Sequence, residues 1–440
     1  MSDWKTFTLA ELGEFRNGAN FSKNAYGHGY PIVNVKQLYS GRFIESDGLR
    51  ELDRNALKHA DRLQLQNGDI LFARSSMVAS GAGQVAMVSK VPSGTIFSGF
   101  IIRFRPTRTD LVQPLFLNYL LRSPSYRERL VRTGTGTSIT NLSQDILGRL
   151  PVRLPSRAVQ EATSEVLDEL DEKIELNRQT ARTLEELAQR LFKSWFVDFD
   201  PVRAKMAGRQ PAHTPPEIAE LFPDHLVDSP LGPIPEGWTI KPIEEVVSIK
   251  GGATPSTKEQ TFWDGGNYNW ATPKDLSGLQ QKVLIKTERK ITSAGVEKIS
   301  SGQLSPGTVL MSSRAPVGYL ALADLPVSIN QGFIAMICDQ GVPNTFVLHW
   351  AEANMDVIKS NAGGSTFAEI SKKQFRPLEV IVPPAPLLQA FDDVAADWFQ
   401  RVSQLAHENV TLTQLRDRLL PRLISGEIRV PEAQEMAEET

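Results

Sequence analysis

The chain has 440 residues, of which 41% are hydrophobic and 22% charged, and its formal net charge is −3. This composition is typical of a globular protein, and the length exceeds one ordinary core, so we expect two or three domains. A single cysteine, Cys338, excludes an internal disulfide framework, and the sequence has no long apolar run; both features predict a cytoplasmic protein without a membrane segment.

The charge is unevenly distributed along the chain. Residues 1–155 hold 20 Lys and Arg against 12 Asp and Glu, a net of +8, whereas residues 238–383 hold 14 against 13, a net of +1. The segments 156–200 and 384–440 are each −5. A basic first domain beside acidic segments suggests a polyanionic partner such as nucleic acid, although a merely solvated basic face is the commoner case.

The sequence contains an internal duplication. The matching pairs are WKTFTLAELGEFRNG (4–18) with WTIKPIEEVVSIKGG (238–252), YPIVNVKQL (30–38) with YNWATPKDL (268–276), LQNGDILFARSS (65–76) with LSPGTVLMSSRA (304–315), GFIIRF (99–104) with GFIAMI (332–337), and GTSITNLSQDILGRLPVRLP (136–155) with GSTFAEISKKQFRPLEVIVP (364–383). We therefore predict an α/β (α+β) protein in which a strand-rich domain and a long helix occur twice. The predicted boundaries are 1–155 and 238–383 for the domains, and 156–199 and 384–428 for the helices.

The two helices are predicted to form an antiparallel coiled coil. Residues 157–196 contain no proline or glycine, and apolar residues recur every seven positions in both helices. About 40 residues per helix correspond to roughly 60 Å. If the mid-seam asparagines Asn177 and Asn409 face each other, three layers pair a small side chain with a large one: Ala188 with Trp398, Ala395 with Leu191, and Ala181 with Leu405. Leu170 then faces Arg416, whose side chain would have to reach outward. We expect Asn177 and Asn409 to touch and to fix the register.

Two further segments are predicted to lie outside the folded domains. Residues 200–237 are rich in proline and polar residues, which indicates a connector rather than a core element. Residues 429–440 form an acidic tail, which we expect to be disordered.

Catalytic signatures are absent from the sequence. It has neither the G-x-x-x-x-G-K-[ST] loop of nucleotide-binding enzymes nor the Asn/Asp-Pro-Pro-aromatic signature of adenine methyltransferases. Its six histidines lack the spacing of metal ligands. The DEK at 171–173 resembles part of a nuclease motif, but its position on a long helix favours a solvated charged face. We expect a protein that binds and has no metal, cofactor or chemistry of its own.

The repeat of strand-rich domain and long helix resembles the specificity subunit of type I restriction-modification enzymes. The stretches that carry the resemblance are WFVDFDPVRAKMAGRQP (195–211), LGPIPEGW (231–238), GDILFAR (68–74), GSTFAEI (364–370) and LLPRLISGEIRV (419–430). The first copy reads GTGTSIT (134–140) where the family has Gly-Ser-Thr-Phe. The loop at 134–140 and the loop at 364–370 therefore need not have the same function.

The resemblance implies two target-recognition domains, each reading one half of a bipartite sequence in double-stranded DNA. The helices would dock two methyltransferase (modification) subunits, and restriction (translocase-nuclease) subunits would join this core. The S-adenosylmethionine, ATP and Mg needed for adenine methylation and DNA cleavage would then be bound by the partner subunits.

A protein that reads DNA needs cations for phosphates and polar side chains for base edges, and polar loops after buried strands supply both. The candidates in the first domain are Arg16, Asn17, Asn20 and Lys23, expected in the loop after the first strand, and Lys36, Arg74, Ser75 and Ser76. Those in the second domain are Lys250, Thr254, Ser256, Lys258, Lys274, Ser313 and Arg314. Arg74 and Arg314, interpreted as equivalent strand ends, are expected to contact guanine or anchor a phosphate.

Two other functions remain open from the residues. The chain could be a stand-alone sequence-specific DNA-binding or scaffold protein without enzyme partners. A nuclease is disfavoured because the sequence shows no clustered carboxylates; cleavage of DNA by the purified chain with Mg²⁺ alone would support it.

Overall fold

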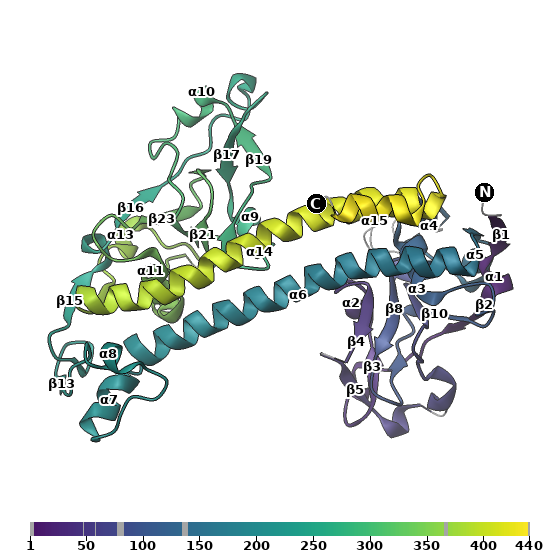
Figure 1. Ribbon diagram of the computed structural model, residues 1–440, viewed down its shortest axis with the longest axis horizontal. Helices are drawn as coiled ribbons and strands as arrows, with labels where there is room; N and C mark the ends of the chain where they lie inside the picture. The colour runs from purple at the N-terminus through teal and green to yellow at the C-terminus, as the bar shows by residue number, and fades with distance from the viewer. Residues whose placement is uncertain are drawn as a thin grey trace. The chain divides into compact units, whose positions relative to one another are not determined.

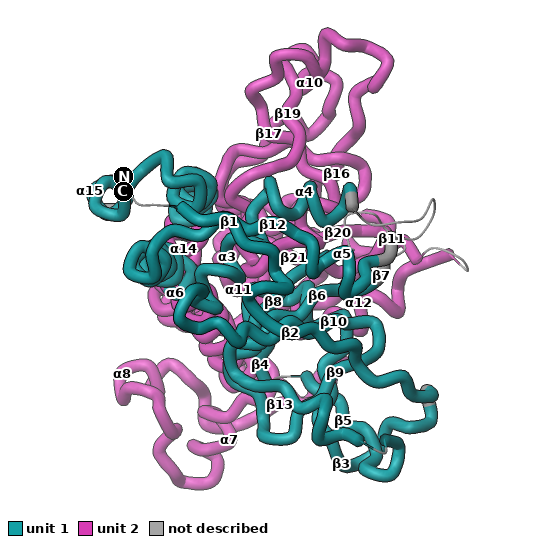
Figure 2. Tube along the Cα trace, turned by 90° about the vertical axis from the view of Figure 1, so that its right-hand side faces the viewer, with its two compact units in different colours: residues 1–172, 411–440 teal, residues 173–410 magenta. Residues whose placement is uncertain are grey.

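Figure 1 shows the protein as a computed structural model, which describes residues 4–46, 48–57, 59–76, 83–133, 140–364 and 368–438. The chain divides into two compact units, coloured separately in Figure 2: Met1–Glu172 with Thr411–Thr440, and Lys173–Val410. Each unit contains one strand-rich domain and one end of each of two long helices, α6 (Arg157–Phe196) and α14 (Ala385–Ser425). No helix in the described ranges is both long and apolar enough to cross a membrane.

The first domain is built on a five-stranded sheet with the order β2-β10-β6-β8-β4. A three-stranded sheet, β5-β3-β9, and the pairs β1-β12 and β11-β7 complete it. Its strands are β1 (Lys5–Thr8), β2 (Gly13–Asn17), β3 (Gly29–Val33), β4 (Phe43–Glu45), β5 (Arg50–Asp53), β6 (Ile70–Ala73), β7 (Ser75–Ser76), β8 (Val85–Lys90), β9 (Ile96–Phe97), β10 (Ile101–Pro106), β11 (Thr140–Asn141) and β12 (Pro151–Leu154). Its helices are α1 (Leu9–Leu12), η1 (Lys23–Ala25), α2 (Val35–Leu38), η2 (Arg54–Ala56), η3 (Ala60–Leu63), α3 (Pro114–Arg122), α4 (Pro124–Thr133) and α5 (Gln144–Gly148).

The second domain repeats the two larger sheets and the pair of its first and last strands, and has an isolated bridge between Arg314 and Glu369 where the first domain has the pair β11-β7. Its five-stranded sheet has the order β16-β23-β20-β21-β18, its three-stranded sheet the order β19-β17-β22, and β15 pairs with β24. Its strands are β15 (Thr239–Pro242), β16 (Ser248–Gly251), β17 (Tyr268–Ala271), β18 (Val283–Leu284), β19 (Arg289–Ile291), β20 (Val309–Ser313), β21 (Val317–Ala323), β22 (Ser328–Ile329), β23 (Phe333–Ile337) and β24 (Glu379–Val382). Its helices are η5 (Ile243–Glu245), η6 (Gln260–Phe262), α9 (Pro273–Ser277), α10 (Ser293–Val296), α11 (Asn344–Ala353), α12 (Met355–Ser360) and α13 (Lys372–Phe375). The predicted duplication and the predicted α/β (α+β) class are confirmed.

The central strand of each five-stranded sheet, β6 or β20, is covered on both faces, and this explains the continuous run of apolar residues in its sequence. All four residues of β6 are buried. Because side chains alternate along a strand, Ile70 and Phe72 enter the core beneath α3, whereas Leu71 and Ala73 enter a separate core on the other face. The equivalent β20 divides its side chains between two cores in the same way. A strand covered on both faces holds its C-terminal end, where the candidate polar residues lie, in a fixed position.

The two long helices pack together in antiparallel order, as predicted. In the second unit the Asn177 Nδ2 atom donates a hydrogen bond to Asn409 Oδ1 at 3.1 Å, so the expected contact is present. In the same unit the rings of Trp195 and Phe391 lie 6.3 Å apart, a pair that belongs to the same register. In the first unit the apolar residues of α6 and α14, Leu167 and Leu419 among them, share one buried cluster.

The segment 200–237 is not merely a connector, which corrects the prediction. It forms α7 (Asp200–Met206), α8 (Pro216–Ala219) and the hairpin of β13 (Leu226–Val227) with β14 (Ile234–Pro235). Val202 and Phe222 are buried in the core of the second unit, and the Phe222 ring lies 5.4 Å from that of Trp195. The high proline content hid the importance of the few apolar residues here, such as Val202 and Phe222, that pack into this core.

The prediction of a disordered tail is wrong for residues 430–438. They form the helix α15 (Val430–Glu438). Val430, Ala433 and Met436 recur every three positions and therefore share one helix face. This face packs against the cluster that contains Leu419 and Leu423 of α14. The prediction of disorder rested on the acidic composition of this segment and did not take account of the spacing of its apolar residues.

Candidate nucleic-acid interface

The first group of candidates in domain 1 lies at one end of β2. Arg16 and Asn17 are exposed residues of β2 itself, not of the loop that follows it, which corrects their predicted position. The loop brings Asn20 against Gly99, so closely that a side chain at Gly99 would overlap the Asn20 amide. The backbone of Lys23 lies in η1. Lys36 is exposed on the short helix α2.

Arg74 follows the last residue of β6 and is exposed. Its backbone N–H donates to the Phe100 carbonyl at 2.8 Å, and its own carbonyl accepts from Leu142 N–H at 2.8 Å. No described side chain hydrogen-bonds or ion-pairs with its guanidinium. Phe100 is itself 64% exposed, which is unusual for a large aromatic side chain. The backbone is thus held from two sides while the cation remains available.

Ser75 and Ser76 form β7, which pairs with β11. Their side chains are outside the described part of the chain, as are the residues 134–139 and 365–367 of the two loops on which the resemblance partly rests.

The second domain places its first candidates in the corresponding segment. Lys250 is exposed on β16, and the Thr254 hydroxyl donates to Gln331 Oε1 at 2.6 Å. The Ser256 carbonyl accepts a hydrogen bond from the Trp263 indole at 3.0 Å. Lys258 is exposed in the turn that follows.

Lys274 does not offer an unpaired charge. It is exposed on α9, and its ammonium lies 2.8 Å from Glu288 Oε2. A hydrogen bond to Glu288 raises the pKa of Lys274 above its ordinary value. Any contact of Lys274 with a phosphate would therefore compete with this carboxylate.

Ser313 and Arg314 also differ from what was expected. The Ser313 side chain is 3% exposed at the end of β20, so in this conformation it is not accessible to DNA. Arg314 is 37% exposed, and its guanidinium lies 3.8 Å from Glu369 Oε2. Arg314 thus has an acidic neighbour that Arg74 lacks among the described residues.

Arg74 and Arg314 are not equivalent positions, contrary to the prediction. The Ile370 N–H donates to the Ser313 carbonyl at 3.0 Å, as the Leu142 N–H does to that of Arg74. Arg74 therefore corresponds to Ser313, and Arg314 corresponds to Ser75. Since consecutive side chains of an extended chain point to opposite sides, a slip of one residue places the two arginines on opposite faces.

The equivalent positions of the two domains carry different chemistry on one backbone frame. Where domain 1 has Asn20 packed against Gly99, domain 2 has the hydrogen-bonded pair Thr254 and Gln331. The exposed Phe100 corresponds to Gly332, because both carbonyls accept a hydrogen bond from the equivalent strand end. This corrects by one residue the predicted match of GFIIRF (99–104) with GFIAMI (332–337), which set Gly99 opposite Gly332. Such variation on a constant frame suits recognition of two different ligands.

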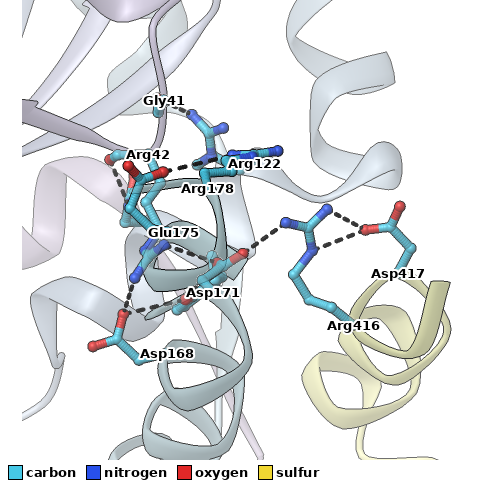
Figure 3. Close-up of polar contacts among 11 residues, drawn as sticks. Gly41, Arg42, Arg122, Asp168, Asp171, Glu175, Arg178, Arg416 and Asp417 are labelled. Atoms are coloured by element: carbon cyan, nitrogen blue, oxygen red, sulfur yellow. Dashed lines mark hydrogen bonds and ion pairs between the residues drawn. The ribbon is translucent and has the colours of Figure 1, made fainter. Parts of the chain in front are cut away.

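Sequence reasoning missed a network of charges that joins domain 1 to both long helices (Figure 3). Asp171 of α6 was expected on a solvated face, but its side chain is only 8% exposed. Arg416 of α14 donates to it at 2.6 Å, Tyr119 of α3 donates at 2.9 Å, and Arg42 lies 3.4 Å away. Arg42 also lies 2.7 Å from Asp168.

This network also explains the layer in which Leu170 was expected to face Arg416. Instead of reaching into solvent, Arg416 binds the buried Asp171 and the neighbouring Asp417, and hydrogen bonds to these carboxylates outweigh burial and raise its pKa. Burial is the main cause that raises the pKa of Tyr119, which therefore stays a hydrogen-bond donor. Within the described ranges no group of three or more His, Cys, Asp or Glu side chains is placed to hold a metal ion.

Comparisons with known proteins agree with this architecture. A family model described as the type I restriction modification DNA specificity domain matches residues 1–186 and 235–409. The type I restriction enzyme HindI specificity subunit of Haemophilus influenzae is 27% identical over 475 residues, which cover 97% of this chain and 100% of that protein. The type I restriction enzyme MjaIX specificity subunit of Methanocaldococcus jannaschii is 35% identical over 176 residues, or 38% of this chain and 40% of that protein.

Among solved structures, the S subunit of a type I restriction-modification system from M. genitalium has a similar fold. The TM-score is 0.60 at 14% sequence identity, and the match covers 96% of both chains. The family model accounts for well over half of the chain and matches it in two separate blocks, one for each strand-rich domain. The chain therefore belongs to the type I restriction-modification DNA specificity family.

Proposed function

We propose that this chain is the non-catalytic, DNA-reading subunit of a type I restriction-modification complex, and that each strand-rich domain reads one half of a bipartite target. The observation that carries this proposal is the pair of equivalent backbone frames with different exposed groups. A protein that read two identical half-sites would have no reason to replace Arg74 by Ser313 and Phe100 by Gly332 at matched positions.

Electrostatics supports the same function. Affinity for DNA depends mainly on cations near phosphates, and domain 1 carries a net charge of +8 against +1 for domain 2. Arg16, Lys36 and Arg74 are exposed in domain 1, and Lys250 and Lys258 are exposed in domain 2. Base edges would be read by the polar and apolar groups among them, because a phosphate contact alone carries no sequence information.

The long helices are proposed to dock two modification subunits, and the restriction subunits would join that core. In this proposal S-adenosylmethionine, ATP and Mg belong to the partner subunits, where methylation of adenine and cleavage of DNA take place. Membership of the specificity family and the twofold repeat of domain and helix support this assignment, since two similar docking surfaces match two copies of one partner. The complex is expected to act in the cytoplasm.

A domain replacement tests the proposal. The full chain is co-expressed with its modification subunit, and methylated adenines are mapped by long-read sequencing. Replacing residues 1–150 by the equivalent part of a relative should change one half of the methylated motif, and replacing 238–383 should change the other half. A change in both halves after either replacement would refute modular reading, and methylation without this chain would refute its role altogether.

A further inference from the structure

In the three-stranded sheet of each domain, the guanidinium of one arginine lies close over the face of an aromatic ring. The guanidinium carbon of Arg50 in β5 is 3.4 Å from the centroid of the Tyr26 ring. The guanidinium carbon of Arg289 in β19 is 3.7 Å from the centroid of Trp263 and 5.4 Å from that of Trp270. A cation over a ring face at these distances is held electrostatically.

These two arginines occupy the same position of the duplicated fold. In the three-stranded sheet of domain 1, Ile32 lies opposite Arg50 on one side and opposite Ile96 on the other. In that of domain 2, Trp270 lies opposite Arg289 on one side and opposite Ser328 on the other. Strand order and strand directions are the same in both sheets, so the stacked arginine is a feature that the two domains share.

Both guanidinium groups are placed to accept a new partner. Both side chains are exposed, and no carboxylate in the described ranges forms an ion pair with either one. Stacking covers the flat face of a guanidinium and leaves its N–H groups directed outward in the plane, an arrangement that suits paired contacts with a phosphate.

The aromatic rings come from the segments in which DNA contacts were predicted. Tyr26 immediately follows η1, where Lys23 lies, and Trp263 follows the turn that contains Lys258. The Trp263 indole also holds the carbonyl of Ser256. Each arginine is therefore tied to the predicted contact loop of its own domain.

We infer that Arg50 and Arg289 are equivalent phosphate-binding residues, one in each recognition domain, which hold the DNA backbone without reading its sequence. This inference rests on the proposed function. The exposed groups that differ between the domains suit base recognition, whereas a charge at a matched position in both suits the part of DNA that every target shares.

The test is the salt dependence of DNA binding by the full chain co-purified with its modification subunit, with a duplex that contains the methylated motif. Loss of one phosphate contact reduces the slope of log K against log salt by about 0.9. When the salt concentration is raised fourfold, DNA binding by the Arg50→Gln or Arg289→Gln complex should weaken about 3.5-fold less than DNA binding by the wild-type complex. The methylated motif should stay unchanged.

Lys290→Gln is the matched control, because Lys290 is the next residue of β19 and its side chain points to the opposite face of the strand. For Lys290→Gln the slope of log K against log salt should equal that of the wild-type complex. Unchanged slopes for Arg50→Gln and Arg289→Gln, with a lower melting temperature alone, would show a purely structural role and overturn the inference. An equal change for Lys290→Gln would also overturn it. Absence of DNA binding by the wild-type complex would instead contradict the proposed function.

Discussion

Replacing Asn177 and Asn409 by leucine, singly and together, tests whether this pair specifies the register of the two helices at the expense of stability. Asn177 is 2% exposed and Asn409 is partly buried. In Asn177→Leu the Asn409 amide loses its partner but keeps some access to water, so we expect destabilisation of about 1 kcal/mol, at the lower end of the range for an unsatisfied polar group.

The double variant should behave differently from the sum of the single ones. It loses one hydrogen bond, worth about 1 kcal/mol, and buries leucine at a site where full burial contributes about 1.5–3 kcal/mol. We therefore expect a net gain of about 1 kcal/mol and a coupling energy near 3 kcal/mol.

Hydrogen exchange of the α6 amides around residue 177 measures these changes locally. Exchange should become about fivefold faster in each single variant and about fivefold slower in the double variant. Gln179→Leu, at an exposed position of the same helix, is the matched control and should change little. If the asparagines fix the register, the double variant should also accept targets with altered spacing between half-sites. A double variant less stable than both single ones would refute the reasoning.

Two further predictions concern charge. Arg74→Ala should reduce the salt dependence of DNA binding more than Arg314→Ala, because Arg314 already has Glu369 beside it and lies in the less basic domain; losses of affinity that do not vary with salt would show that neither residue contacts phosphate. His225 lies between two carboxylates, and the hydrogen bonds that its ring donates, to Asp224 first and Glu236 second, raise its pKa. Its contribution to stability is therefore complete below pH ~6.5 and lost as pH rises through the raised value. The protection factors of amides in the β13–β14 hairpin, which correct for the intrinsic rise of exchange with pH, should fall over that interval, and His225→Asn should abolish this fall.

The duplication was predictable because apolar spacing and turn residues are local signals that survive divergence. The alignment even placed Arg16 opposite Lys250, which the strand register confirms. It also placed Arg74 opposite Ser313, as the hydrogen bonds from Leu142 and Ile370 confirm; the expectation that Arg74 and Arg314 are equivalent matched the two arginines by residue type and was wrong by one position. The match of GFIIRF with GFIAMI was itself one residue out, because two residues that both precede phenylalanine, Gly99 and Gly332, look equivalent in sequence but not in strand register.

The parts that sequence did not predict depend on contacts between distant segments. Asp171 is buried because Tyr119 of α3 and Arg42, neither of which belongs to the heptad pattern, join Arg416 of α14 as its polar partners. The stacking of Arg50 and Arg289 depends on sheet register and on aromatic residues that precede them by more than 20 positions. Burial in the segment 200–237 depends on residues such as Val202 and Phe222, whose partners lie elsewhere in the second unit.

The charge network around Asp171 limits which recognition domains can be exchanged. Two of its donors, Arg42 and Tyr119, belong to the first domain, whereas Asp171 and Asp168 belong to α6. A graft that ends at residue 150 imports new residues at the first two positions and leaves both carboxylates in place. Removing the donors of a buried carboxylate costs about 3 kcal/mol or more, enough to unfold a marginal hybrid. Recombination between relatives should therefore yield stable chimeras only where the incoming domain carries an arginine and a hydroxyl donor at these two sites.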